Sequence, residues 1–239
     1  MTAGRVGIPE GTAGKSRGVP CQKKAQIYFF SGTGNARAAA RWFGSSAWEN
    51  GWDAKLTDLS AMKKRRLKEP PEKDLVGFFS PTHGFNLPPI MLHFIFRFPR
   101  AGGQRVILLN TRAGMKMGKL FLPGLSGMAL WLPALVLLLK GYHIHSVKSI
   151  DLPSNWISLH PGIKPGVVDS IYHRRKRQMV DYTRNILSGR SEFRPLRSLA
   201  FDIAITPIGL LYYFFGRFVL GKTFIATRDC TRCDVCVEQ

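Results

Sequence analysis

The segment QIYFFSGTGNARAAARWF, residues 26–43, joins a strand-like sequence to a helix-like one. An apolar run at 27–30 stops at Ser-Gly-Thr-Gly-Asn, and Ala- and Arg-rich residues that favour a helix follow. A glycine-rich turn in this position leaves backbone N–H groups unpaired at the positive end of the helix dipole. Such a turn favours a bound phosphate, and the side chains of Ser31, Thr33 and Asn35 add hydrogen-bond donors.

Two common nucleotide-binding motifs do not fit this loop. A Walker loop requires Lys and then Ser or Thr after its last glycine, whereas this chain has Ala36 and Arg37. The dinucleotide fingerprint requires a third Gly or Ala at the position of Arg37 and an acidic residue about twenty positions later, where Asp58 is only loosely placed. The loop therefore predicts a site for a single phosphate, held by hydroxyl groups and backbone amides.

The rest of the chain alternates strand-like runs with helical stretches. The strand candidates lie at 26–30, 52–56, 74–80, 105–110 and 142–151, and the helix candidates at 35–50, 89–98, 126–140 and 167–187. This alternation predicts an α/β fold with a doubly wound, five-stranded parallel sheet. Ligands of such sheets bind beyond the carboxyl ends of the strands, so we expect a site formed by the loops at 31–36, 80–86 and 110–114.

The first of these loops resembles the phosphate loop of the flavodoxin family, which has the pattern Thr/Ser-x-Thr-Gly-x-Thr. The resemblance implies the strand order 2-1-3-4-5 and a bound FMN. It assigns the phosphate to Ser31, Gly32, Thr33, Gly34, Asn35 and Ala36. Ala36 departs from the pattern, because flavodoxins usually have a hydroxyl residue there. The loss of one hydrogen bond, worth about 1 kcal/mol, predicts weaker FMN binding.

The same resemblance implies that two further loops cover the flavin ring. They contribute Ser80, Pro81, Thr82, His83, Gly84 and Phe85, and then Asn110, Thr111, Arg112 and Gly114. Gly84 allows a peptide group to face the ring, and Phe85 is placed to stack on it. Two alternatives stay open, namely that His83 contacts no ligand and that Phe85 is a core aromatic residue. No catalytic acid, base or nucleophile stands out.

The last residues contain a cysteine motif. Cys230, Cys233 and Cys236 have the spacing C-x2-C-x2-C, which bacterial ferredoxins use to bind a 4Fe-4S cluster. The next cysteine of that motif would follow Gln239, so we expect an incomplete ligand set and a ferredoxin module that begins but does not continue. Zinc is the alternative metal, but no nearby His completes a four-ligand site in the sequence.

Together, the two motifs resemble the EFR-type flavodoxin/ferredoxin fusion proteins of anaerobic bacteria over residues 25–239. This resemblance implies electron transfer between FMN and iron–sulfur centres, with redox proteins as partners. Composition and this resemblance together suggest the following division: a disordered basic tail at 1–24, a flavodoxin-like FMN-binding domain at 25–190, an apolar and basic linker at 191–227, and the start of a ferredoxin-type module at 228–239. The linker is expected to be a helical, apolar extension of the domain and a candidate for membrane contact.

Charge and hydropathy leave a role for membranes open. The chain has 35 Lys and Arg against 15 Asp and Glu, a net charge of +20 that attracts polyanions or anionic lipid. The apolar run at 120–139 is interpreted either as a helix of the domain or as a membrane contact. A second run at 203–216, flanked by basic residues, suits either shallow insertion into a lipid surface or packing on the domain.

We expect a cytoplasmic chain, peripheral at the inner face of the membrane if it binds lipid, because residues 1–24 lack the apolar core of a secretory signal. The basic runs at 62–68 and 172–178 raise a nucleic-acid alternative. No aromatic stacking platform or nucleic-acid motif accompanies them, so we expect no specific nucleic-acid partner.

Overall fold

The computed structural model describes residues 23–63, 67–117, 120–122, 124–154, 163–193, 199–216, 218–223, 225–226 and 230–233. The tail predicted at 1–24 lies outside these residues, except for its last two positions, which begin the first strand. Part of the basic run at 62–68, residues 155–162 and Cys236 also lie outside the described residues.

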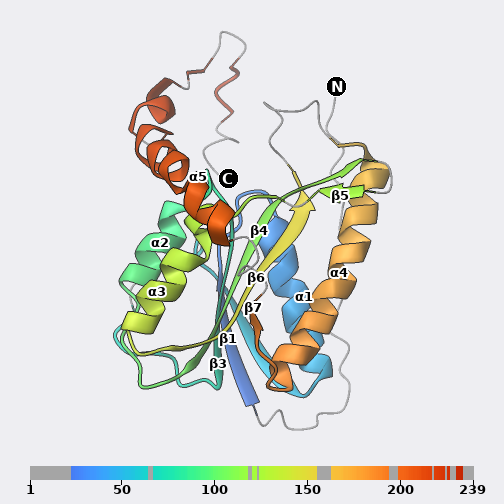
Figure 1. The fold of residues 1–239 in the computed structure, drawn as a ribbon, viewed down its shortest axis with the longest axis vertical. Helices are drawn as coiled ribbons and strands as arrows, with labels where there is room; N and C mark the ends of the chain where they lie inside the picture. Colours follow the sequence, from blue (N-terminus) through green and yellow to red (C-terminus); the bar gives the residue numbers. More distant parts are fainter. Residues whose placement is uncertain are drawn as a thin grey trace.

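A parallel sheet forms the centre of the molecule (Figure 1). Its strands run in the order β2-β1-β3-β4-β6-β7, and every neighbouring pair in this order is parallel. The strands are β1 Lys23–Phe29, β2 Trp52–Asp58, β3 Leu75–Pro81, β4 Arg105–Met117, β6 His143–Pro153 and β7 Glu192–Phe193. The first five of these have the predicted order 2-1-3-4-5, so the fold is flavodoxin-like and doubly wound.

The sheet extends beyond the five predicted strands in two places. β4 continues to Met117 and turns back into the short antiparallel strand β5, Leu120–Leu122. At the far edge, β7 pairs with β6. Lys148 holds this edge through an ion pair with Glu192 at 2.8 Å.

Helices cover both faces of the sheet, as the nearly continuous apolar strands require. α1, Asn35–Glu49, and α4, Pro165–Leu187, lie on one face, and α2, Pro89–Phe96, and α3, Trp131–Leu139, lie on the other (Figure 1). α2 and α4 each begin with proline, which fits the first turn because it needs no N–H partner there.

Alternate residues of the central strands supply two separate cores. On β1, Ile27 packs on the α1/α4 side, whereas Tyr28 packs on the α2/α3 side among Phe78, Phe94 and Phe98. Each such side chain contributes about 1.5–3 kcal/mol through its removal from water. These two cores hold the carboxyl ends of the strands in fixed positions.

The apolar run at 120–139 is not one continuous helix. It divides into β5, the short 3₁₀ helix η1 at Gly127–Ala129, and α3. α3 supplies the predicted crossover between β4 and β6, although it begins later than the expected 126. Pro133 and Leu137 face the core, whereas Leu135, Leu138 and Leu139 are exposed.

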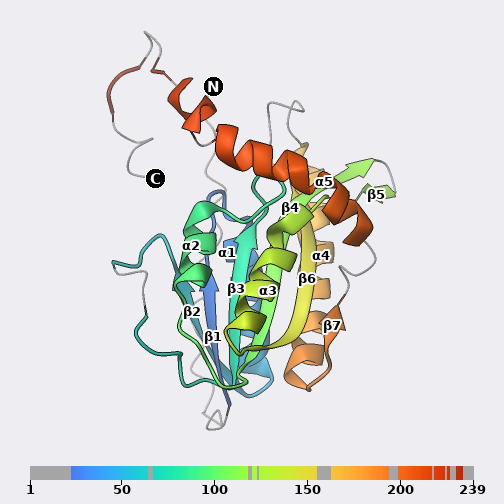
Figure 2. The ribbon, with the colours of Figure 1, turned by 60° about the vertical axis from the view of Figure 1, so that its left-hand side comes forward.

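A further helix lies across the carboxyl ends of the strands (Figure 2). α5 spans Leu199–Leu211 and continues into a π-helical turn, η3, at Tyr212–Gly216, followed by a 3₁₀ turn, η4, at Leu220–Thr223. The segment 199–216 is the only helix long and apolar enough to cross a membrane in the part of the chain that the structure describes. The region predicted as a linker thus contains an ordered helix above the candidate site.

Candidate functional site

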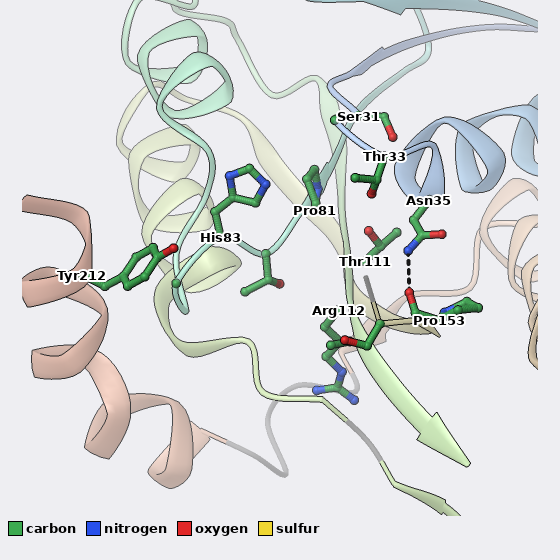
Figure 3. Close-up of a pocket in the computed structure, with 14 residues that line it drawn as sticks. Ser31, Thr33, Asn35, Pro81, His83, Thr111, Arg112, Pro153 and Tyr212 are labelled. Carbon is green, nitrogen blue, oxygen red and sulfur yellow. Dashed lines mark hydrogen bonds between the residues drawn. The ribbon is translucent and has the colours of Figure 1, made fainter. Parts of the chain in front are cut away.

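A cavity of about 360 Å³ opens at the carboxyl ends of β1, β3, β4 and β6 (Figure 3). β1 pairs with β2 on one side and β3 on the other, so the chain direction of the crossovers reverses here. This is the topological switch point at which doubly wound sheets bind ligands. The cavity is lined by Ser31, Gly32, Thr33, Asn35, Pro81, Thr82, His83, Gly84, Thr111, Arg112, Ala113, Pro153, Ser154 and Tyr212.

The loop between β1 and α1 forms one wall. The Oγ of Ser31 accepts a hydrogen bond from the N–H of Gly34 at 3.1 Å, which closes the turn. The N-cap of α1 is Gly34, which has a φ of +95°. Because glycine has no side chain, no side chain caps the helix there. A Cβ added to Gly32 would meet no described heavy atom within 4 Å. The loop thus leaves open space beside an electropositive helix terminus, which favours an anion.

Asn35 lines the cavity and also holds the loop in place. Its Nδ2 donates to the carbonyl of Pro153 at 3.0 Å, and its Oδ1 accepts a hydrogen bond from the hydroxyl of Tyr172 at 2.7 Å. The side chain therefore connects the loop to the end of β6 and to α4.

A tight turn after β3 forms the opposite wall. The backbone groups of His83 and Asn86 exchange two hydrogen bonds, at 2.8 and 3.0 Å. Gly84 and Phe85, between them, both have positive φ, at 51° and 62°, as in type I′ turns. The imidazole of His83 lines the cavity, and its partial desolvation by the surrounding groups lowers its pKa.

Tyr212 brings the C-terminal helix to the same wall. A Cβ on Gly84 would lie 1.9 Å from Cδ1 of Tyr212, so only glycine allows this approach. Figure 3 shows the Tyr212 ring beside the turn at the edge of the cavity. α5 also crosses the turn closely at Gly209, where a Cβ would lie 3.2 Å from the carbonyl oxygen of Gly84.

Arg112 gives the cavity a fixed positive group. Its Nε donates to Oδ1 of Asp151 at 2.6 Å, and a second nitrogen lies 3.4 Å from Oδ2 of the same carboxylate. Arg175 of α4 also contacts Asp151, with its Nε donating to the backbone carbonyl at 3.0 Å. Two guanidinium groups share one carboxylate, so the cluster carries net positive charge.

Six of the predicted site residues do not line the cavity. These are Gly34, Ala36, Ser80, Phe85, Asn110 and Gly114. Each has a structural contact or a buried position instead: Nδ2 of Asn110 donates to the hydroxyl of Thr82 at 2.7 Å, and a Cβ on Gly114 would lie 2.8 Å from Cβ of Asp151. Phe85 packs against η1 and α5, where its carbonyl accepts the N–H of Met128.

Four lining residues were not among the predicted site residues, although Ala113 belongs to the predicted loop at 110–114. Pro153 ends β6, which runs past its expected end at 151, and Ser154 follows it. Tyr212 comes from a segment that the sequence placed in a linker. An aromatic pair within an uncharged run was the only sequence signal for it.

The cysteine motif is described only in part. Cys230 and Cys233 are exposed, and Cys236 lies outside the described residues. Within the described residues, no group of three or more His, Cys, Asp or Glu side chains could hold a metal ion. The predicted cluster site therefore stays a prediction.

Comparisons with known proteins give structural neighbours alone. No family model and no curated protein matches the chain. Oxidised flavodoxin 1 from Bacillus cereus is similar at 15% identity, over 66% of this chain and 97% of that one, with a TM-score of 0.43. A flavodoxin from the domain Archaea is 17% identical, over 68% and 98%, with a TM-score of 0.44. Two-electron reduced Megasphaera elsdenii flavodoxin is 15% identical, over 64% and 98%, with a TM-score of 0.43. Likeness at this level says nothing of activity.

Proposed function

We propose that this protein binds FMN in the cavity at the β1/β3 switch point and transfers electrons through it. The observation that carries the proposal is the open, glycine-lined N-terminus of α1, because it offers backbone N–H groups and empty space to one phosphate. The cavity volume of about 360 Å³ falls within the range of roughly 300–1,000 Å³ that is typical of cofactor sites.

The lining residues divide into groups that suit the two ends of the cofactor. The hydroxyl groups of Ser31 and Thr33 and the loop N–H groups would hold the phosphate. The walls at 81–84 and 111–113, with Tyr212, would hold the ring. Bound FMN supplies one- and two-electron transfer, and the protein supplies position and electrostatics.

The positive charge of the protein bears on the reduction potential. The Arg112–Asp151–Arg175 cluster and the net charge of +20 both lower the free energy of an anionic reduced flavin. The proposed carrier therefore has a less extreme low potential than an acidic protein with the same cavity. Redox proteins are its partners, and iron–sulfur centres bound by C-x2-C-x2-C are part of this proposal on the strength of the spacing alone.

A substitution at Gly32 tests the proposal. A Cβ at this position meets no described heavy atom within 4 Å, and the carboxylate of Gly32→Asp would bring negative charge to the space assigned to the phosphate. If this charge displaces the phosphate from two charge-assisted hydrogen bonds of about 1.5 kcal/mol each, FMN should bind at least ~100-fold more weakly. Titration of the flavin-free protein, followed by flavin fluorescence, gives the dissociation constants of FMN and riboflavin.

Gly102 offers a matched control, because a Cβ there also meets no described atom within 4 Å and the residue does not line the cavity. Gly102→Asp should bind FMN as the unaltered protein does. Equal FMN affinity in Gly32→Asp and Gly102→Asp, or equal affinity for FMN and riboflavin in the unaltered protein, would exclude the phosphate site.

A further inference from the structure

In the helical segment formed by α5 and η3, residues 199–216, the charged side chain faces the domain and large apolar side chains face outward. This is the reverse of the usual arrangement in helices of water-soluble proteins. Such helices turn apolar residues toward the core and charged residues toward water. Here the only charged side chain, Asp202, is 2% exposed and faces the domain, as does the buried Gly209. The outward residues are large and apolar, and they are 47–69% exposed: Phe201, Ile203, Ile208, Leu211, Phe214 and Phe215.

The inward face is firmly attached to the domain. Asp202 accepts hydrogen bonds from the N–H of Gly127 at 2.9 Å and from the indole N–H of Trp131 at 3.1 Å. Two helical turns later, Gly209 lies against the turn at Gly84 and Phe85. The apolar residues are therefore exposed because the helix is docked by its opposite face, not because it lacks a docking position.

We propose that the outward face of this helical segment binds the surface of an anionic lipid bilayer. An apolar patch of this extent is unusual on a monomeric protein and marks an interaction surface. Basic residues flank the segment in the sequence, with Arg194 and Arg197 before it and Arg217 and Lys222 after it, and this composition favours an anionic lipid as the partner. An uncharged apolar face with basic flanks is typical of helices that lie in the membrane interface.

The helix lies in the plane of the interface rather than across the bilayer. Eighteen residues are enough to approach the thickness of the hydrocarbon core. Crossing it would remove Asp202 from its two donors and place a carboxylate in lipid, which is strongly unfavourable. Shallow insertion keeps both attachments and covers the outward side chains. This inference is independent of the proposed flavin.

Flotation of the full-length chain with lipid vesicles tests it. We expect binding to vesicles of phosphatidylcholine with 30% phosphatidylglycerol, about 10-fold weaker binding to phosphatidylcholine alone, and weakening by 0.5 M salt. The triple variant Ile208→Gln, Leu211→Gln, Phe215→Gln should lose at least about 10-fold in binding to the anionic vesicles. These side chains are exposed and do not line the cavity, so the fold and the flavin site stay intact.

The matched control changes three equally exposed apolar residues of α3, with Leu135→Gln, Leu138→Gln and Leu139→Gln. It should bind vesicles as the unaltered protein does. Equal binding by the α5 variant, or equal loss in the α3 variant, would overturn the inference. So would retention in vesicles after alkaline carbonate, which indicates a spanning helix, or an oligomer that the α5 variant converts to monomers without any vesicle binding.

Discussion

At the scale of single residues, the site depends on glycines, which leave space, and on side chains that form hydrogen bonds with other parts of the protein. Gly32 leaves space for a ligand, whereas Gly84 leaves space for the ring of Tyr212. Asn35, predicted as a phosphate donor, is hydrogen-bonded to Pro153 and Tyr172. The loop composition predicted the first of these roles. The other two depend on residues far away in the sequence, which no local pattern can reveal.

Tyr212 gives the most direct prediction at this scale. If the flavin ring lies against it, Tyr212→Ala should weaken FMN binding by about 2- to 10-fold, as expected for the loss of one aromatic contact of about 0.5–1.5 kcal/mol. The fluorescence of bound FMN should rise, because a neighbouring phenol quenches it. Tyr212→Phe should keep most of the affinity.

Phe214 is the control for this experiment, because it lies on the same turn, is exposed and does not line the cavity. Phe214→Ala should leave both affinity and fluorescence unchanged. Unchanged binding and emission in Tyr212→Ala would place the flavin ring away from α5.

At the scale of elements, the helix α5 depends on one buried carboxylate. Asp202→Ala leaves the N–H of Gly127 and the indole N–H of Trp131 without their acceptor. The N–H of Gly127 is buried, and one unsatisfied buried donor costs about 1–3 kcal/mol, so the free energy of unfolding should fall by at least that amount. Amide hydrogen exchange in residues 199–216 should accelerate more than in the strands.

Asp181 provides the comparison, because it forms an exposed ion pair with Arg184 on α4. Asp181→Ala should change stability by less than about 0.5 kcal/mol. If Asp202→Ala behaves like Asp181→Ala, the two hydrogen bonds do not attach α5 to the domain.

Some helices and strands follow directly from their sequence patterns, and others do not. The helices α1 and α4 were predicted close to their observed bounds, as for α4, expected at 167–187 and found at Pro165–Leu187. β4, expected at 105–110, instead continues to Met117. β5 was missed because its residues belong to an uncharged run that resembles a helix. The position of α5 was also unpredictable, because it depends on the contacts of Asp202 and Gly209 with distant loops.

At the scale of the whole molecule, both proposed activities lie at the carboxyl end of the sheet. The cavity opens at the carboxyl ends of the strands, and α5 lies across the same end (Figure 2). Tyr212, in η3 directly after α5, lines the cavity. A bilayer on the outward face of α5 would therefore lie near the proposed flavin. The net charge of +20 attracts both proposed ligands, because the cofactor and the lipid surface are each anionic.

The absorption spectrum of protein purified without oxygen tests the central claim most directly, when it is followed by acid release and identification of any flavin. We predict flavin bands and about one FMN released per chain, since the cavity offers one phosphate position. An added broad iron–sulfur shoulder would support the cysteine motif as a cluster site. A colourless protein that takes up no added FMN would contradict the assignment of the cavity.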